Sequence, residues 1–167
     1  VTVSASVNKI AAARLSYLDG AAATGSFALA DSLIFAPGQQ VEILAGAGND
    51  STSIFIGQVV KIGLRIRDNS APQYLVDCRH IAMKLTATER NADFFDQTDS
   101  DIMSAILSAA GLDADIESTT TTHEQVLQFQ ATDWDFLLAR ARANGQQVWC
   151  EDERIVARKP TLSEPPV

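Results

Sequence analysis

Hydrophobic and polar residues alternate along much of the first half of the chain, a pattern typical of half-buried β-strands. The alternation is clearest over residues 54–67, where the aliphatic residues of one parity are Ile54, Ile56, Val60, Ile62, Leu64 and Ile66. This stretch is longer than a usual strand, so we expect a bend in it, most naturally at Gly57 or Gly63. Shorter stretches with strand character lie at 11–17, 27–29, 41–44 and 74–78.

Turn-forming residues separate these stretches. Gly20 follows Leu18 and Asp19, and the pair Pro37 and Gly38 follows Phe35. Proline presets φ and glycine supplies positive φ, so both places are predicted turns. Further loops are expected at 46–51 and 68–72, and the glycines of the first lack the Lys-Ser/Thr of a phosphate-binding loop. Several antiparallel strands that share one apolar face predict a small β-barrel or a strongly curved sheet.

The second half changes to helical spacing. Residues 99–110 carry Ile102, Ile106 and Leu107 on one face, with Thr98 or Asp99 as the predicted N-cap. Gly111 and Leu112 then end the helix as in a Schellman motif.

A second helix is predicted from Thr132 to Gly145. Thr132 is the expected N-cap, and Asp135 lies three residues on, where the acid of a capping box reaches back to the cap. Gly145 is the expected left-handed stop. The apolar face of this helix is formed by Trp134, Leu137, Leu138 and Ala141.

The remaining segments complete an α+β fold that is mainly β. Residues 89–97 read as a polar connection, 118–122 as a polar loop and 126–130 as a strand. A hairpin is predicted from 147–150 and 154–158, around Glu151-Asp152-Glu153. We therefore expect a barrel-like domain over residues 1–88, an α/β lobe with two helices and a hairpin over 89–159, and a linker or disordered tail over 160–167.

Composition restricts the classes of function. The chain is 46% hydrophobic and 20% charged, as is usual for a globular protein, and its formal net charge is −8. This charge repels phosphate backbones and argues against nucleic-acid binding. No apolar run reaches the roughly 20 residues that span a bilayer, and residues 1–4 do not resemble a signal peptide. The start at Val1 and the prolines near the end favour a segment of a longer protein.

Candidate catalytic and metal-binding residues are sparse. His80 and His123 have no ligand partners at metal-binding spacing, so both are predicted to be exposed polar residues. Cys78 and Cys150 are predicted to be free thiols. We therefore predict no enzyme, no cofactor and no metal site. An acidic cluster without the glycine and terminal glutamate of a calcium loop is best explained by helix capping and solvation; its members are Asp93, Asp96, Asp99 and Asp101.

The Asp133 and Asp135 pair and the two tryptophans are explained by structural roles rather than by catalysis or ligand binding. Asp133 and Asp135 are two apart on a helix and point in different directions, so they cannot flank one glycosidic bond. Trp134 and Trp149 are expected to anchor the core rather than to form a ligand platform.

Several motifs occur in the order and spacing of one family. Asn8-Lys9-Ile10, Ala13-Arg14-Leu15 and Leu18-Asp19-Gly20 match an opening strand. Phe35-x-Pro37-Gly38 and Phe55-x-Gly57 match the next strands, and Asp99, Ile102 and Gly111 match a first helix. The most distinctive segment contains Thr132, Trp134, Asp135, Phe136, Leu137 and Gly145. Over residues 8–159 the chain resembles the VgrG-like hub proteins of contractile injection machines, most closely those of extracellular, phage-tail-like particles.

This resemblance implies a structural protein that joins an inner tube to a spike. Such hubs carry two tube-like barrels with an α/β lobe between them, and three subunits present a pseudo-sixfold face to the inner-tube protein, beside other baseplate proteins. This chain matches only the first barrel and the lobe, so we expect it to form weak trimers or none alone. It would be made in the bacterial cytoplasm and act in an injection particle. The alternative is a stand-alone β-barrel module that binds a peptide or a sugar.

Overall fold

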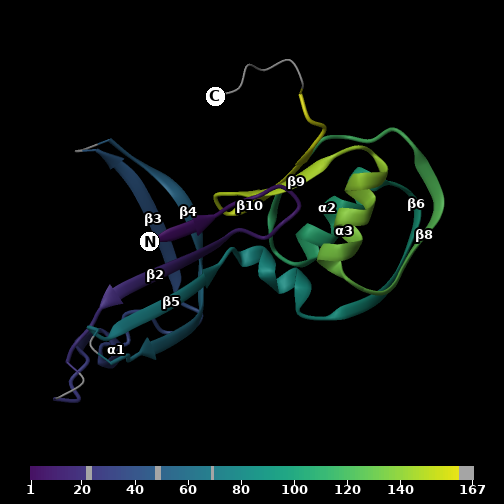
Figure 1. Cartoon of the computed structure of the whole chain (residues 1–167). Helices are drawn as coiled ribbons and strands as arrows, with labels where there is room; N and C mark the ends of the chain where they lie inside the picture. Colours follow the sequence, from purple (N-terminus) through teal and green to yellow (C-terminus); the bar gives the residue numbers. More distant parts are fainter. Residues whose placement is uncertain (22–23, 48–49, 69, 162–167) are drawn as a thin grey trace. The chain divides into compact units, whose positions relative to one another are not determined.

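The chain folds into two units, the first with one β-sheet and the second with two helices and two smaller sheets (Figure 1). The structure is a computed structural model and describes residues 1–21, 24–47, 50–68 and 70–161. The first unit contains Val1–Ala5 and Ala11–Ile81, and the second contains Ser6–Ile10 and the chain from Ala82 onward. Strands dominate over helices, which confirms the predicted mainly β, α+β fold.

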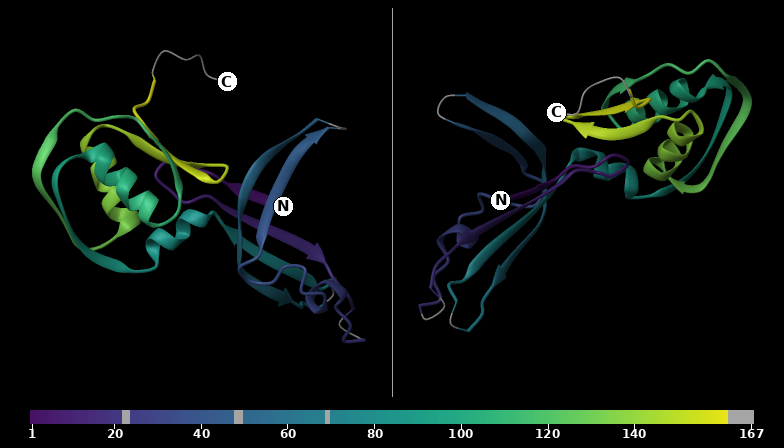
Figure 2. Two further views of the ribbon diagram at one scale, coloured as in Figure 1. Left: turned by 180° about the vertical axis from the view of Figure 1, so that it is seen from behind. Right: turned by 45° about the horizontal axis from the view of Figure 1, so that its top comes forward.

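The first unit is a five-stranded antiparallel sheet with the strand order β1-β2-β5-β4-β3. Figure 2 shows that the β3–β4 hairpin curls away from the other strands, which gives the sheet its half-barrel curvature. The loop expected at 46–51 is too long, because β3 reaches Ala47 and β4 begins at Asp50; Gly48 and Asn49 lie outside the described residues. The five strands are β1 (Thr2–Ser4), β2 (Ala12–Leu18), β3 (Gln40–Ala47), β4 (Asp50–Arg65) and β5 (Gln73–Arg79).

One face of this sheet is buried, and we call it the inner face. Leu15, Val76 and Val59 are buried there on three neighbouring strands. Phe35 covers part of this face: its ring stacks on Tyr17, with centroids 5.5 Å apart, and lies 6.4 Å from that of Tyr74. The opposite face, which we call the outer face, carries polar residues such as Arg14 and Asp77.

The buried residues of β4 are odd-numbered in its first part, and the residues that share their face are even-numbered in its last part. Its pairing with β5 shifts register between Val59 and Lys61, so Val60 is an extra residue. Before the shift, Phe55 and Val59 are buried; after it, Ile62 pairs with the buried Val76 and shares its face. The expectation that the even-numbered residues form one face is therefore wrong, because a bulge reverses the side to which each parity points.

The irregularities of β4 are thus at Val60, against β5, and at Ile54, against β3, rather than at either glycine. Gly57 has a different role. It is buried, and a Cβ at this position would overlap the carbonyl oxygen of Arg79 and lie 2.6 Å from Cζ of Phe55. Glycine is therefore needed where β4 passes close to the end of β5.

The turns of the first unit follow their sequence signals, but the strand expected at 27–29 is wrong. Gly20 and Gly38 both have positive φ, as predicted. Residues Ala28–Asp31 form a single helical turn, α1. The buried carboxylate of Asp19 accepts hydrogen bonds from the backbone N–H groups of Leu29 and Ala30, both at 3.0 Å, and so stabilises the turn.

The second unit packs two helices between a three-stranded sheet and a two-stranded ribbon. The sheet has the order β7-β10-β9, with β7 parallel to β10, and the ribbon pairs β6 with β8. In Figures 1 and 2 the ribbon curves around α2 and α3. The elements are η1 (Ile81–Thr86), β6 (Glu89–Thr98), α2 (Asp99–Ala109), β7 (Asp113–Ile116), β8 (Thr122–Thr132), α3 (Asp133–Ala143), β9 (Gln147–Glu151) and β10 (Arg154–Arg158).

Both helices begin and end where the sequence predicts. Thr98 caps α2, and its backbone N–H and hydroxyl oxygen form a full capping box with Asp101. Thr132 caps α3 by accepting the N–H of Asp135 at 3.1 Å, and the Asp135 carboxylate accepts the Thr132 hydroxyl rather than a backbone N–H. Gly111 and Gly145, which follow the helices, have φ of +62° and +69°.

Two other expectations for this unit are wrong. Residues 89–97 are not a connection, since they pair with β8 along their length as β6. Their polar composition reflects a ribbon with one solvent-facing side, while Phe94 on the other side stacks on Phe136 at 5.8 Å. The strand expected at 126–130 is also longer, because it is paired from Thr122 to Thr132.

Candidate assembly surfaces

Part of the inner face is apolar and exposed. Ile62 and Leu64 lie beside Val76 and Tyr74, which are almost completely buried, yet their own side chains are 36% and 39% exposed. Ile66, just beyond the end of β4, is 54% exposed. A half-barrel that does not close leaves such positions open, and we call Ile62, Leu64 and Ile66 the β4 apolar strip.

A second apolar surface lies on the ribbon. Phe95, Leu127 and Phe129 are 55–64% exposed. The register of β6 and β8 places Phe95 and Leu127 on one face, and Phe129 follows Leu127 by two residues on the same strand. Gln125 and Asp93 lie on the same face and are joined by a hydrogen bond of 3.0 Å. We call Phe95, Leu127 and Phe129 the ribbon surface; Asp93 lies beside its apolar residues.

The opposite side of the ribbon contains a buried polar contact. The side chain of Gln128 is almost completely buried, and its Nε2 donates to Asp133 Oδ1 and to the carbonyl oxygen of Ala131, both at 3.0 Å. Arg90 Nε lies 3.5 Å from the other carboxylate oxygen of Asp133. These contacts fix β8 against the start of α3, so Asp133 is a structural residue.

Asp99 joins three elements of the second unit. Its side chain is 4% exposed and accepts a hydrogen bond from Asn144 Nδ2 at 2.7 Å. His123 Nε2 lies 3.1 Å from the same oxygen, and Arg140 Nη1 lies 3.3 Å from the other oxygen. The sequence predicts Asp99 only as a capping or solvated residue. Its role as a cross-link could not be found from spacing, because its partners lie far along the chain.

The two histidines differ from the sequence expectation. His80 is buried at the end of β5, where its backbone N–H donates to the carbonyl oxygen of Ala11 at 2.9 Å. His123 is half-buried, since one side of its ring faces Asp99. The prediction of two exposed histidines is therefore wrong, because each lies at a strand end that packs against other residues.

The motif residues lie in structural positions. Phe35 stacks on the inner face, Pro37 and Gly38 form a turn, and Phe55 and Gly57 lie buried in β4. In the second unit the buried motif residues are Asp99, Ile102, Trp134, Phe136 and Leu137. Thr132, Asp135, Gly111 and Gly145 are at helix ends. The motif residues thus lie in the cores of the two units, in turns and at helix ends.

Other candidate chemistry is limited. Among the described residues, no three His, Cys, Asp or Glu side chains are arranged to hold a metal ion. Neither Cys78 nor Cys150 is in a disulfide among the described residues, as predicted, and burial raises the pKa of the Cys78 thiol. In the described part of the chain, no helix combines the length and apolarity needed to cross a bilayer.

Solved structures share this fold. The chain is similar to the 43 kDa tail protein of prophage MuSo2 from Shewanella oneidensis, with a TM-score of 0.60, 12% identity and coverage of 91% of this chain and 44% of that one. It is also similar to a tail protein from Neisseria meningitidis MC58, with a TM-score of 0.66, 14% identity and coverage of 95% and 44%.

A third similar structure comes from Escherichia coli. It is described as a component of the type VI secretion system with structural similarity to the bacteriophage T4 tail proteins gp27 and gp5. The TM-score is 0.64 and the identity 15%, with coverage of 94% of this chain and 46% of that one. The chain thus spans less than half the length of each of these proteins.

Sequence comparison identifies the family. No curated protein matches the chain. The sequence model of the Alg8 N-terminal domain matches residues 1–167, the whole chain. With a fold shared by phage-tail and type VI secretion proteins and a family match from end to end, the chain belongs to the Alg8 N-terminal domain family.

Proposed function

We propose that this chain is a structural hub component of a contractile injection apparatus, VgrG-like and non-enzymatic, which connects the inner tube to the spike. The observation that carries the proposal is the shared fold, which extends over 91–95% of the chain with TM-scores of 0.60–0.66. Two of the similar proteins are tail proteins and the third is a type VI secretion component. The phage-tail-like, extracellular type of particle is the setting we favour.

The exposed apolar surfaces support an assembly role. The β4 apolar strip continues a face that is buried elsewhere in the sheet, so water covers side chains that would be more stable against protein. We infer that further copies of the hub cover this strip in a trimer with a pseudo-sixfold face. The inner-tube protein and other baseplate proteins are the remaining partners that we propose.

The greater length of the similar proteins affects whether this chain alone is expected to form a trimer. Each is more than twice as long as the part that this chain covers. In the ring that we propose, each of three subunits contributes two barrel domains, and the five-stranded sheet of this chain corresponds to one of them. Trimer formation by this chain alone is therefore expected to be weak or absent.

Gene deletion tests the assembly role. Loss of the gene in the producing bacterium should abolish assembled injection particles in electron micrographs, and the natural gene should restore them. The double variant Ile62→Asp, Leu64→Asp should fail to restore them, because it places charges in an apolar contact. Leu18→Asp is the control, since Leu18 is exposed on the outer face of the same sheet.

Two outcomes would contradict the proposal. Normal particles in the deletion strain would remove the hub function and favour a stand-alone binding module. Normal particles with the double variant would show that the β4 apolar strip is not an assembly contact. The variants must accumulate to the natural level in both experiments, so that a failure to fold is not mistaken for a failure to assemble.

A further inference from the structure

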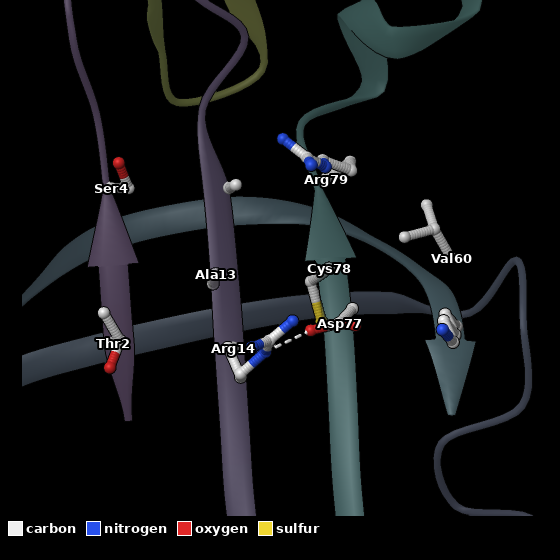
Figure 3. Close-up of a pocket in the computed structure, with 10 residues that line it drawn as sticks. Thr2, Ser4, Ala13, Arg14, Val60, Asp77, Cys78 and Arg79 are labelled. Atoms are coloured by element: carbon white, nitrogen blue, oxygen red, sulfur yellow. Dashed lines mark hydrogen bonds and ion pairs between the residues drawn. The ribbon is translucent and has the colours of Figure 1, made fainter. Parts of the chain in front are cut away.

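The outer face of the five-stranded sheet carries a basic cluster on an acidic chain. The chain has 21 acidic and 13 basic residues, yet three cations gather around the single carboxylate of Asp77. They line an open hollow of about 480 Å³, which Figure 3 shows and which we call the basic hollow. The residues that line it include Thr2, Ser4, Ala12, Arg14, Lys61 and Arg79.

Strand register builds the hollow. Asp77 on β5 is directly opposite Arg14 on β2 and Lys61 on β4, so the three side chains form one row across the sheet. In the next row on the same face, Arg79 is opposite Ala12. The small Ala12 side chain leaves space between Arg14 and Arg79. Thr2 and Ser4 pair with Arg14 and Ala12, so β1 adds a hydroxyl to each row.

The charges in the hollow do not balance. Arg14 Nε donates to Asp77 Oδ1 at 2.6 Å. This hydrogen bond, followed by the positive charges of Arg14, Lys61 and Arg79, lowers the pKa of Asp77, which stays ionised at neutral pH. One carboxylate thus faces three cations. Within the described residues, neither Lys61 nor Arg79 has an ion-pair partner of its own.

We propose that the basic hollow binds a carboxylate side chain from an acidic segment of a partner protein. A planar carboxylate fits the guanidinium forks of Arg14 and Arg79, and the hydroxyls of Thr2 and Ser4 supply further donors. Three cations and one carboxylate leave two uncompensated positive charges, which one or two carboxylates of a partner would neutralise. A densely charged polyanion is less favoured, because Asp77 lies within the site and the whole chain carries a charge of −8.

Fluorescence anisotropy with a labelled peptide of alternating glutamate and serine tests this proposal. We expect saturable binding to the 167-residue chain at low salt, weakening as ionic strength rises. Arg79→Gln and Lys61→Gln should each weaken binding about three- to fivefold, as is usual for exposed ion pairs. Asp77→Asn should strengthen binding, because it removes the one opposing charge and frees Arg14.

Matched controls distinguish binding at the basic hollow from non-specific electrostatic attraction between the peptide and the chain. Lys84→Gln makes the same change of charge at an exposed position in η1 and should leave the affinity unchanged. A peptide with glutamine in place of glutamate should not bind. Equal weakening by Arg79→Gln and Lys84→Gln would overturn the proposal, as would no effect of any substitution. Tighter binding of an oligonucleotide than of the acidic peptide would overturn the assigned class of partner.

Discussion

Asp99, the first residue of α2, accepts a hydrogen bond of 2.7 Å from the side chain of Asn144, the residue that caps the end of α3. The start of one helix is thereby tied to the end of the other. Arg140 and His123 face the same carboxylate. The negative charge also lies at the positive end of α2, where the helix dipole stabilises it.

Replacing Asp99 should therefore weaken the second unit. Asp99→Asn leaves Arg140 and His123 beside a neutral group, and we expect the free energy of unfolding to fall by about 2–4 kcal/mol. Urea denaturation followed by circular dichroism measures the change. Asp93→Asn, at an exposed acidic position, should change stability by less than about 0.5 kcal/mol. Equal effects of the two substitutions would mean that the Asp99 contacts contribute no net stability.

Trp134 anchors the core of the second unit. Its side chain is 6% exposed, so Trp134→Ala should lower the free energy of unfolding by about 3–5 kcal/mol through lost burial and a cavity. Phe129→Ala is the matched aromatic control, because Phe129 is 64% exposed. An unchanged denaturation midpoint for Trp134→Ala would contradict the buried position and make this residue a candidate assembly contact.

The two glycines of β4 should respond differently to alanine. Gly57→Ala places a methyl group against the Arg79 carbonyl oxygen and the Phe55 ring, and we expect a loss of about 1–3 kcal/mol. At Gly63 a Cβ meets no atom within 4 Å, so Gly63→Ala should be neutral or slightly stabilising. Thermal unfolding of both variants checks the pair. A similar loss for both would point to a general need for backbone freedom in β4.

The Arg14–Asp77 pair should make stability depend on pH at the acid end. The pKa of Asp77 is lowered in the folded chain, first by the hydrogen bond from Arg14. A lowered carboxyl pKa stabilises the fold above the unfolded value, and this contribution is lost as pH falls through the folded value. The stability difference between the natural chain and Asp77→Asn should thus be present at neutral pH and shrink below about pH 4. A difference that stayed constant down to pH 2 would contradict this.

The oligomeric state of the chain tests the expected weakness of the trimer. Light scattering at micromolar concentration should report a mass near 17.9 kDa, that of one chain. A longer hub protein with a second barrel should instead form trimers. A stable trimer of the 167-residue chain would show that one barrel and the lobe are sufficient for assembly.

Local sequence signals predicted the two long helices and several turns, but not the helical turn α1. The ends of α2 and α3 depend on Thr98, Thr132, Gly111 and Gly145, and each acts on residues within three or four positions of itself. The turn at Gly38 depends likewise on neighbouring residues. These interactions are contained in a short segment, so their pattern is visible in the sequence.

Two features of the strands required the tertiary structure, because they join segments far apart in the chain. The bulge at Val60 reverses which parity of β4 is buried, and no local pattern marks it. Strand β6 is too polar to resemble a strand, and only its pairing with β8 makes it one.

Partners brought together by the fold determine the surfaces as well. Asp99 reaches partners 24 and 45 residues away, and the basic hollow takes its charges from β2, β4 and β5. The sequence by itself determined where helices cap, where the chain turns and that the fold is mainly β, because those choices rest on neighbouring residues. Register and long-range packing decided which apolar and charged side chains reach the surface together.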